Sequence, residues 1–174
     1  VAAGLSGYVI PLRAVAEGWS TLVISLMATS YAVAFTASCV ISPRLVRRVG
    51  HVRVFGVMVT MLSVSQLLNV LVVDPTIWIL SRGMTGFALA GSYMIIESWL
   101  NEKVTNENRG ALFSVYMVVT MGGLTVGQYM VPFGDPLLPT LFIIAAVIYS
   151  FAIMPTSLSS AQSPQPLHQD RMNI

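Results

Sequence analysis

The chain has 174 residues, of which 55% are hydrophobic and 9% are charged. A soluble domain of this length would carry about 44 charged residues, because charged side chains make up about 25% of an ordinary soluble domain. Here there are 16, nine Lys or Arg and seven Asp or Glu, with a formal net charge of +2. So few charges cannot cover a water-exposed surface. This excludes a soluble globular enzyme and a disordered chain, and it indicates that the bilayer is the solvent.

Hydrophobic segments follow one another along the chain and predict an all-α integral membrane protein with six helical spans. We expect the spans at residues 1–11, 21–41, 54–73, 75–100, 111–131 and 136–154. The first is too short to cross a hydrocarbon core of about 30 Å, so we interpret it as the second half of a helix whose beginning is missing. Residues 1–154 are then one half-bundle domain. Residues 155–174, with Ser, Gln and Pro throughout, are a predicted linker or tail.

Basic residues are distributed unevenly between the predicted loops. The loops 42–53 and 101–110 and the tail fall on one side of the membrane, and Arg13 falls on the other. The first side holds seven Lys or Arg, which are Arg44, Arg47, Arg48, Arg53, Lys103, Arg109 and Arg171. By the positive-inside rule this side is cytoplasmic. We therefore expect a multi-pass protein of the plasma membrane, the bacterial inner membrane, with the lipid bilayer as its main partner.

Arg82 is the basic residue predicted to lie inside the membrane. A charge at bilayer depth costs at least ~2.5–3.5 kcal/mol on insertion scales, so it usually faces a bundle interior or a water-filled cavity. On a helical wheel, Gly86, Tyr93 and Glu97 lie within about 60° of Arg82. This column is typical of a stripe that lines an aqueous path for substrate or protons. The alternative is an arginine near the outer interface that extends to the headgroups.

The fifth predicted span has a column of its own. Thr120, Gly123 and Gly127 lie within about 40° of Tyr116 on the wheel. The two glycines form a small-xxx-small pattern that allows close packing with another helix. Gln128 lies elsewhere on this span and is a candidate either for lining a cavity or for bonding a neighbouring helix. Two other spans also carry polar residues.

Tyr31, on the second span, is open to the same two interpretations as Gln128. Gln66 and Asn69 lie three residues apart on the third span. We interpret them as interhelical hydrogen-bonding residues rather than ligands.

The sequence shows no pattern typical of catalysis. Both histidines, His51 and His168, lie outside the predicted spans, and no group of His, Cys, Asp and Glu has metal-ligand spacing. The single cysteine, Cys39, excludes an intramolecular disulfide. No glycine-rich phosphate loop or Walker sequence is present, so we expect no enzyme activity, metal or cofactor, and transport that is driven by an existing gradient. The few basic residues indicate no nucleic-acid partner.

Three local patterns resemble those of one transporter family. In the basic segment, Arg48, Gly50 and Arg53 match the family pattern Gly-x-x-x-Asp-Arg-x-Gly-x-Arg-Arg. Pro43 stands where this pattern has its first Gly, and Arg47 stands where it has an acid.

The other two patterns lie on the fourth and fifth spans. Arg82, Gly86 and Ala90 match the fourth-helix pattern of Arg, Gly and a small residue at four-residue steps. Glu97 followed by Arg109-Gly110 looks like the arrangement that forms cytoplasmic ion pairs with the basic loop. The antiporter pattern of the fifth helix is matched only in part, since Gln128 stands where Pro is expected.

The chain therefore resembles the N-terminal six-helix half of a major facilitator superfamily transporter. Its PRLVRRVGH and ESWL stretches look most like the YcaD-like branch, whose substrates are unassigned. The resemblance implies twelve helices in two halves, with a small solute bound between them and access that alternates between the two sides. A missing C-terminal half is then a partner, and a proton is the candidate coupling ion.

The resemblance also implies roles for individual residues. Five would belong to a substrate or proton pathway, namely Arg82, Tyr93, Tyr31, Tyr116 and Gln128. Six would form a cytoplasmic gate of ion pairs, namely Arg44, Arg47, Arg48, Arg53, Glu97 and Arg109. Four would serve helix packing, namely Gly86, Ala90, Gly123 and Gly127. Two alternatives remain, a non-transporting membrane sensor or scaffold on the same bundle and a half-size protein that forms a homodimer.

Overall fold

The computed structural model describes residues 1–105 and 107–155, and this part of the chain is helical without strands. The α-helices are α1 (Ala2–Ala16), α2 (Thr21–Val49), α3 (His51–Leu71), α4 (Pro75–Lys103), α5 (Arg109–Met130) and α6 (Thr140–Phe151), with a short 3-10 helix η1 (Val131–Phe133). Four of them, α2 to α5, are long and apolar enough to cross a membrane, while α1 and α6 are shorter apolar helices. The predicted all-α membrane bundle is confirmed.

Helix starts follow the local chemistry of the sequence. The Asp74 carboxylate accepts hydrogen bonds from the backbone N–H groups of Thr76 and Ile77 at 2.8 and 3.1 Å, and Pro75 occupies the first position of α4. This is the capping that the Asp-Pro pair predicts. Gly50 separates α2 from α3 with a φ of 90°, a conformation that glycine adopts without a steric penalty.

Several predicted boundaries differ from the helices of the structure. The basic segment 42–53 is not a loop, because α2 continues to Val49 and α3 begins at His51. Arginine is a good helix former, so the helix extends past the apolar span with its charged side chains outside the bundle. The last helix is shorter than the predicted 136–154, because Asp135 accepts a hydrogen bond from the Leu137 N–H and holds a turn before Thr140.

Helix α1 likewise continues beyond the predicted residue 11, through Pro11, to Ala16. Almost all of the predicted tail, residues 156–174, lies outside the described residues. Arg171, which contributed to the predicted charge asymmetry, is among them.

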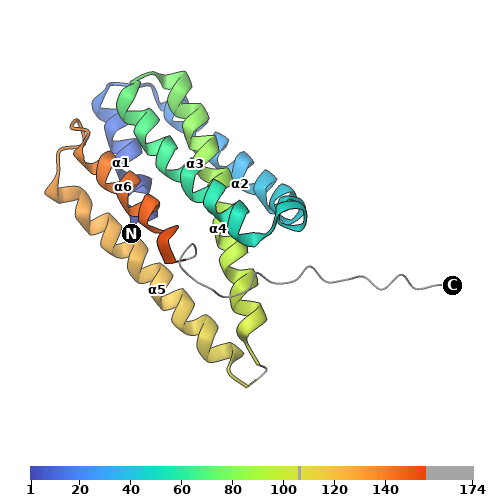
Figure 1. The fold of residues 1–174 in the computed structure, drawn as a ribbon. Coiled ribbons are helices and arrows are strands. Elements are labelled where there is room, and N and C mark those ends of the chain that lie inside the picture. Colours follow the sequence, from blue (N-terminus) through green and yellow to red (C-terminus); the bar gives the residue numbers. More distant parts are fainter. Residues whose placement is uncertain (106, 156–174) are drawn as a thin grey trace.

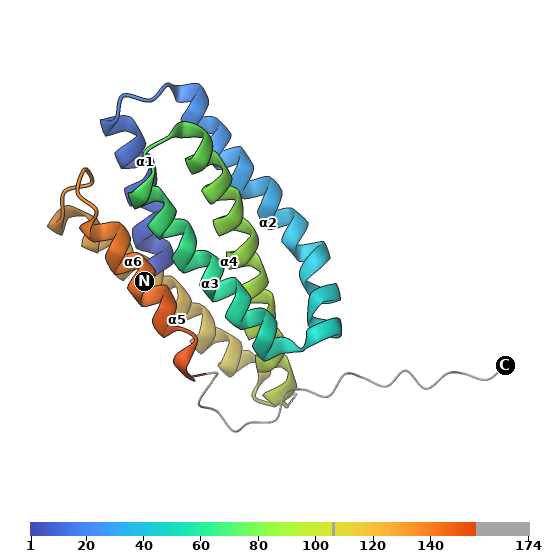
Figure 2. The same cartoon turned by 45° about the horizontal axis from the view of Figure 1, so that its top comes forward.

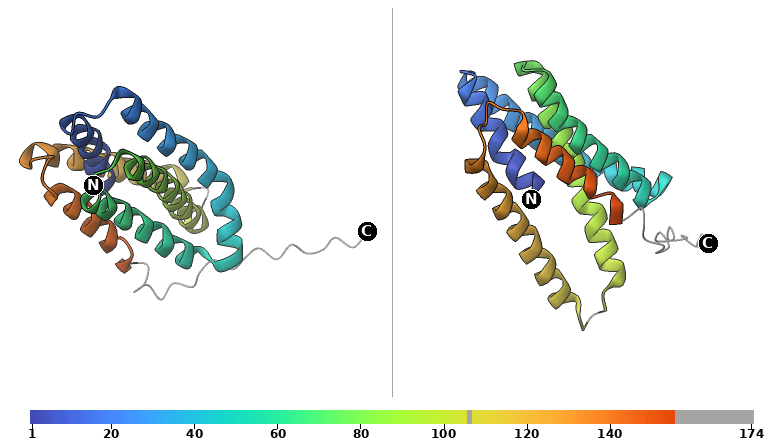
Figure 3. Two further views of the ribbon diagram at one scale, coloured as in Figure 1. Left: turned by 90° about the horizontal axis from the view of Figure 1, so that it is seen from above. Right: turned by 60° about the vertical axis from the view of Figure 1, so that its left-hand side comes forward.

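The helices pack against one another in a defined order. Helix α4 lies between α2 and α3, α3 also packs on α6, and α1 packs on both α5 and α6 (Figures 1 and 2). Seen from above, α2 and α3 flank α4 on two sides (Figure 3). The buried apolar core includes Leu5 and Ile10 of α1, Met58 of α3, and Trp78 and Ile95 of α4.

Helices α2 and α5 differ from the rest in their exposure. Only 11% of the apolar window of α2 and 6% of that of α5 are buried, against 50% for α3 and 44% for α4. Their outward side chains include Leu22, Val33, Val118 and Val119. Two long helices of this half-bundle therefore present wide apolar faces to their surroundings.

Candidate functional site

A concavity with a volume of about 390 Å³ lies among α1, α2, α4 and α5. Polar or charged groups and soft apolar side chains share its wall. It is lined by Ala3, Tyr31, Leu89, Tyr93, Glu97, Tyr116, Met117, Thr120, Met121 and Leu124.

Helical periodicity explains how two helices line this cavity. Leu89, Tyr93 and Glu97 are spaced four residues apart along α4, so they form one column on its surface. Helix α5 contributes the matching column Tyr116, Thr120 and Leu124. The sequence prediction that Tyr93, Tyr31 and Tyr116 belong to one pathway stays a prediction about transport, but the structure does bring these three side chains to one cavity.

Glu97 lies at the point where the two columns meet. The Tyr116 hydroxyl donates a long hydrogen bond of 3.5 Å to a Glu97 carboxylate oxygen. The Glu97 side chain is exposed, and no ion pair joins it to an arginine within the described residues. Glu97 is therefore a charged group that faces the cavity rather than part of a closed ion pair in this conformation.

Arg82 lies beside the cavity and contacts one of its lining residues. Its guanidinium carbon lies over the Tyr31 ring, 4.6 Å from the ring centroid, but Arg82 is not among the lining residues. It is partly buried, and within the described chain it has neither a carboxylate partner nor a hydrogen-bond acceptor. Its contact is a cation–π interaction with a residue that does line the cavity.

The predicted gate arginines are separated from Glu97 in this conformation. Arg44 donates a hydrogen bond of 3.0 Å to the Val40 carbonyl of its own helix. Arg47, Arg48, Arg53 and Arg109 are exposed, as is Arg44. Among the described residues the ion pair is Arg13–Glu17, far along the sequence from the predicted gate.

The predicted packing residues have close neighbours. A Cβ atom at Gly86 would collide with the backbone carbonyl of Tyr31, and one at Gly127 would collide with the Val1 carbonyl and the Leu5 N–H. Gly123 faces Val1 less closely, and Ala90 is buried. Gly86 therefore permits α4 to approach the backbone of α2, and Gly127 permits α5 to approach α1.

Gln128 is exposed on α5 and does not line the cavity, so the structure does not bring it to the other pathway residues.

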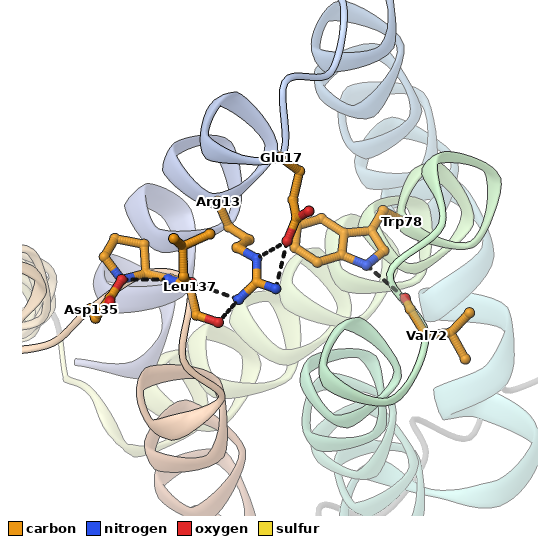
Figure 4. A network of polar contacts seen from close by, with 7 residues as sticks. Arg13, Glu17, Val72, Trp78, Asp135 and Leu137 are labelled. Carbon is orange, nitrogen blue, oxygen red and sulfur yellow. Dashed lines mark hydrogen bonds and ion pairs between the residues drawn. The ribbon is translucent and has the colours of Figure 1, made fainter.

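Sequence reasoning missed a polar cluster at the other end of the bundle (Figure 4). The Arg13 guanidinium pairs with Glu17 at 2.6 Å and donates hydrogen bonds to the carbonyl groups of Pro136 and Leu137. It thereby ties the end of α1 to the turn before α6. The spacing of Arg13 and Glu17 by four residues is a signal for the ion pair, but nothing in the sequence indicates the carbonyl partners.

A second polar cluster lies buried between α3 and α4. Ser81 donates a hydrogen bond of 2.5 Å to Asn69, and Thr85 donates one of 2.9 Å to Ser65. Asn69 is thus an interhelical hydrogen-bonding residue, as predicted. Gln66 is completely buried but bonds only Ser65 of its own helix.

The fold and the cavity together define a class of protein, a multi-pass α-helical membrane protein with a cavity of mixed polar and apolar lining between its helices. The family model described as Major Facilitator Superfamily matches residues 1–170. The chain belongs to this family.

Curated relatives support the same assignment. Proteins named as uncharacterized MFS-type transporters from Yersinia pestis (strain Pestoides F) and Yersinia pseudotuberculosis serotype O:3 (strain YPIII) are each 26% identical over 121 residues. The match covers 70% of this chain and 32% of each relative, so the matched segment corresponds to about a third of each relative's length. No solved structure gives a significant match.

Proposed function

We propose that the chain forms half of a secondary active transporter, which moves a small solute across the membrane by alternating access. The observation that carries this proposal is the meeting of Tyr31, Tyr93 and Tyr116 in one cavity of a family member. A protein that only scaffolds a complex has no need of a cavity lined by hydroxyl groups and a carboxylate. The family assignment also favours transport over catalysis.

A second six-helix half would complete the site. The apolar faces of α2 and α5 are wide and adjoin the cavity, so a partner half that packs on them would also close it. The short match to the much longer relatives supports this arrangement. Residues 1–154 would then be one domain, and 155–174 would begin the connection to the other half. The YcaD-like assignment belongs to this proposal.

Arg82 would act on the cavity through Tyr31. Its guanidinium contacts the ring of a lining residue, so its charge influences the pathway without reaching the cavity itself. A proton is the proposed coupling ion, and Gln128 would join the pathway only through contacts with the second half.

The gate proposal requires a change of partner. Glu97 now accepts a bond from Tyr116, and it would exchange this bond for an arginine of the segment 42–53 or for Arg109 when the cavity closes. Such an exchange is a two-state element of the kind that alternating access needs. Segments 42–53 and 101–110 would face the cytoplasm, with the protein in the plasma membrane.

Cysteine labelling tests alternating access before any substrate is known. In the complete natural protein with Cys39→Ser, Thr120→Cys places a thiol in the cavity wall, and we expect a membrane-impermeant maleimide to label it from either side of the membrane. Val118→Cys, on the exposed apolar face of α5, is the control and should be labelled from neither side. Labelling of Thr120→Cys from one side only would contradict alternating access.

A further inference from the structure

The cavity carries a single charged lining residue, and that residue is negative. Four helices supply the lining residues, among them Glu97 from α4, Tyr31 from α2, Tyr116 and Thr120 from α5, and Ala3 from α1. The arginines of the segment 42–53 do not line it, and Arg82 lies over the Tyr31 ring without lining it. Within the described chain the cavity wall is therefore acidic, although the chain as a whole has a positive formal charge.

The Glu97 carboxylate lacks a balancing charge. It accepts a hydrogen bond of 3.5 Å from the uncharged Tyr116 hydroxyl, and no described Lys or Arg pairs with it. An anionic solute in this cavity would be repelled by Glu97, whereas a cation would gain an ion pair that strengthens as water leaves the closing site. At the Glu97 end of the cavity the lining charge thus favours a positive ligand, while the Arg82 guanidinium lies over the Tyr31 ring, 4.6 Å from its centroid.

The rest of the lining indicates what kind of cation fits. Tyr93 and Tyr116 provide aromatic rings, which attract ammonium groups through cation–π interactions, whereas the Tyr31 ring already lies under the Arg82 guanidinium. Met117 and Met121 provide adaptable apolar surface. A bare metal cation prefers several oxygen ligands, and a wall with one carboxylate and much apolar surface offers poor coordination.

We propose that this cavity binds amphipathic organic cations, with the positive group near Glu97 and the apolar body against the tyrosine and methionine side chains. The inference rests on the proposed transport function, for which it names the substrate class. A cavity volume of about 390 Å³ lies in the range of sites for drug-sized molecules rather than peptides.

Equilibrium binding of radiolabelled tetraphenylphosphonium to the complete natural protein in detergent tests the proposal. We expect saturable binding that Glu97→Gln weakens by about tenfold or more and that Glu97→Asp largely retains, because the charge is kept. Glu102→Gln is the matched control. This glutamate is exposed near the same end of α4 but does not line the cavity, so its removal should leave binding unchanged.

A further variant separates a ligand role of Glu97 from a gate role. Arg48→Gln would disturb the proposed gate from the arginine side while leaving the carboxylate in the cavity. If Glu97 acts on binding only through the gate, Arg48→Gln should weaken tetraphenylphosphonium binding as much as Glu97→Gln does, which would overturn the proposal. Sodium chloride, compared at constant ionic strength, should not displace tetraphenylphosphonium if the site takes organic cations.

The opposite charge preference would also overturn the proposal. Tetraphenylborate has the same shape as tetraphenylphosphonium but a negative charge, so preferential binding of tetraphenylborate would identify an anion site. Transport could still operate in that case. Conversely, Glu97-dependent binding of tetraphenylphosphonium without its movement into proteoliposomes, and with one-sided labelling of Thr120→Cys, would support the site and contradict the transport function.

Discussion

The polar side chains of α4 belong to two contrasting seams. Toward α3, Ser81 and Thr85 are buried and each bonds a partner on the neighbouring helix. Toward α5, Tyr93 and Glu97 face an open cavity, and Glu97 makes only a long bond to Tyr116. In the first seam hydrogen bonds between side chains serve packing, whereas in the second the polar groups remain available for a ligand. Polar side chains inside a membrane bundle therefore indicate a binding function only where they line a cavity.

The largest loss of stability is expected where α4 packs most closely. Gly86→Val would place side-chain atoms against the Tyr31 carbonyl, and the resulting overpacking should cost about 3 kcal/mol and reduce the yield of folded protein. Fluorescence-detected size-exclusion chromatography with heating measures both effects. Gly122→Val is the control, because a Cβ there meets no atom within 4 Å. Equal stability of the two variants would show that α2 and α4 are not in close backbone contact.

A smaller loss is expected in the seam between α3 and α4. Ser81→Ala removes the donor that bonds Asn69, and interhelical bonds of this kind contribute about 0.6–2 kcal/mol in membranes. Thermal unfolding in the same detergent measures the change. Thr29→Ala is the control, since the Thr29 hydroxyl is exposed and bonds a carbonyl of its own helix. A Ser81→Ala protein as stable as the control would remove the packing role that we assign to this seam.

The cluster at the opposite end of the bundle should contribute about 1 kcal/mol. Arg13→Gln would lose the ion pair to Glu17 and the hydrogen bonds to the turn before α6, although partial exposure screens the charge. We expect a lower unfolding temperature whose difference from wild type shrinks as salt is added. A difference that does not depend on salt would assign the effect to the carbonyl bonds alone.

The smallest effect on stability is expected in the seam between α4 and α5. Tyr116→Phe removes one hydroxyl from an open cavity, so the unfolding free energy should change by less than about 0.5 kcal/mol. Binding of tetraphenylphosphonium should instead weaken by a few fold, because the Glu97 carboxylate loses the bond that orients it. Tyr129→Phe, on the exposed face of α5, should change neither quantity. A stability loss as large as that of Ser81→Ala would show that the two seams do not differ in kind.

Much of this contrast could be predicted from local sequence, and its limits have physical causes. The four-residue spacing of Tyr93 and Glu97, and of Tyr116 and Thr120, gives the face of each helix. It does not give the neighbour that this face meets, so the position of Tyr31 between Arg82 and the cavity depends on tertiary packing. The same limit applies to Gln128, which periodicity leaves open and which the structure places on the exposed side of α5.

Helix boundaries show a second limit. Hydropathy detects where a segment leaves the hydrocarbon, but a helix of good helix formers continues beyond that point. Residues 44–49 are therefore helical although they were expected in a loop. Asp74-Pro75, by contrast, acts through its immediate neighbours, because the Asp74 carboxylate accepts hydrogen bonds from the first N–H groups of α4.

The contact of Gly86 with the Tyr31 backbone has a mechanical consequence. Because α2 and α4 approach each other through main-chain atoms at this point, the spacing between Tyr31 and Tyr93 is set by close backbone packing of the two helices. Helix α5 makes few contacts with α4 and packs on α1 instead, so Tyr116 is not held against Tyr93 by direct packing of their helices. Under the proposed function, a ligand would lie between the closely packed pair α2 and α4 on one side and α5 on the other. Substitutions along α5 should then change the range of accepted molecules without altering the α2–α4 side.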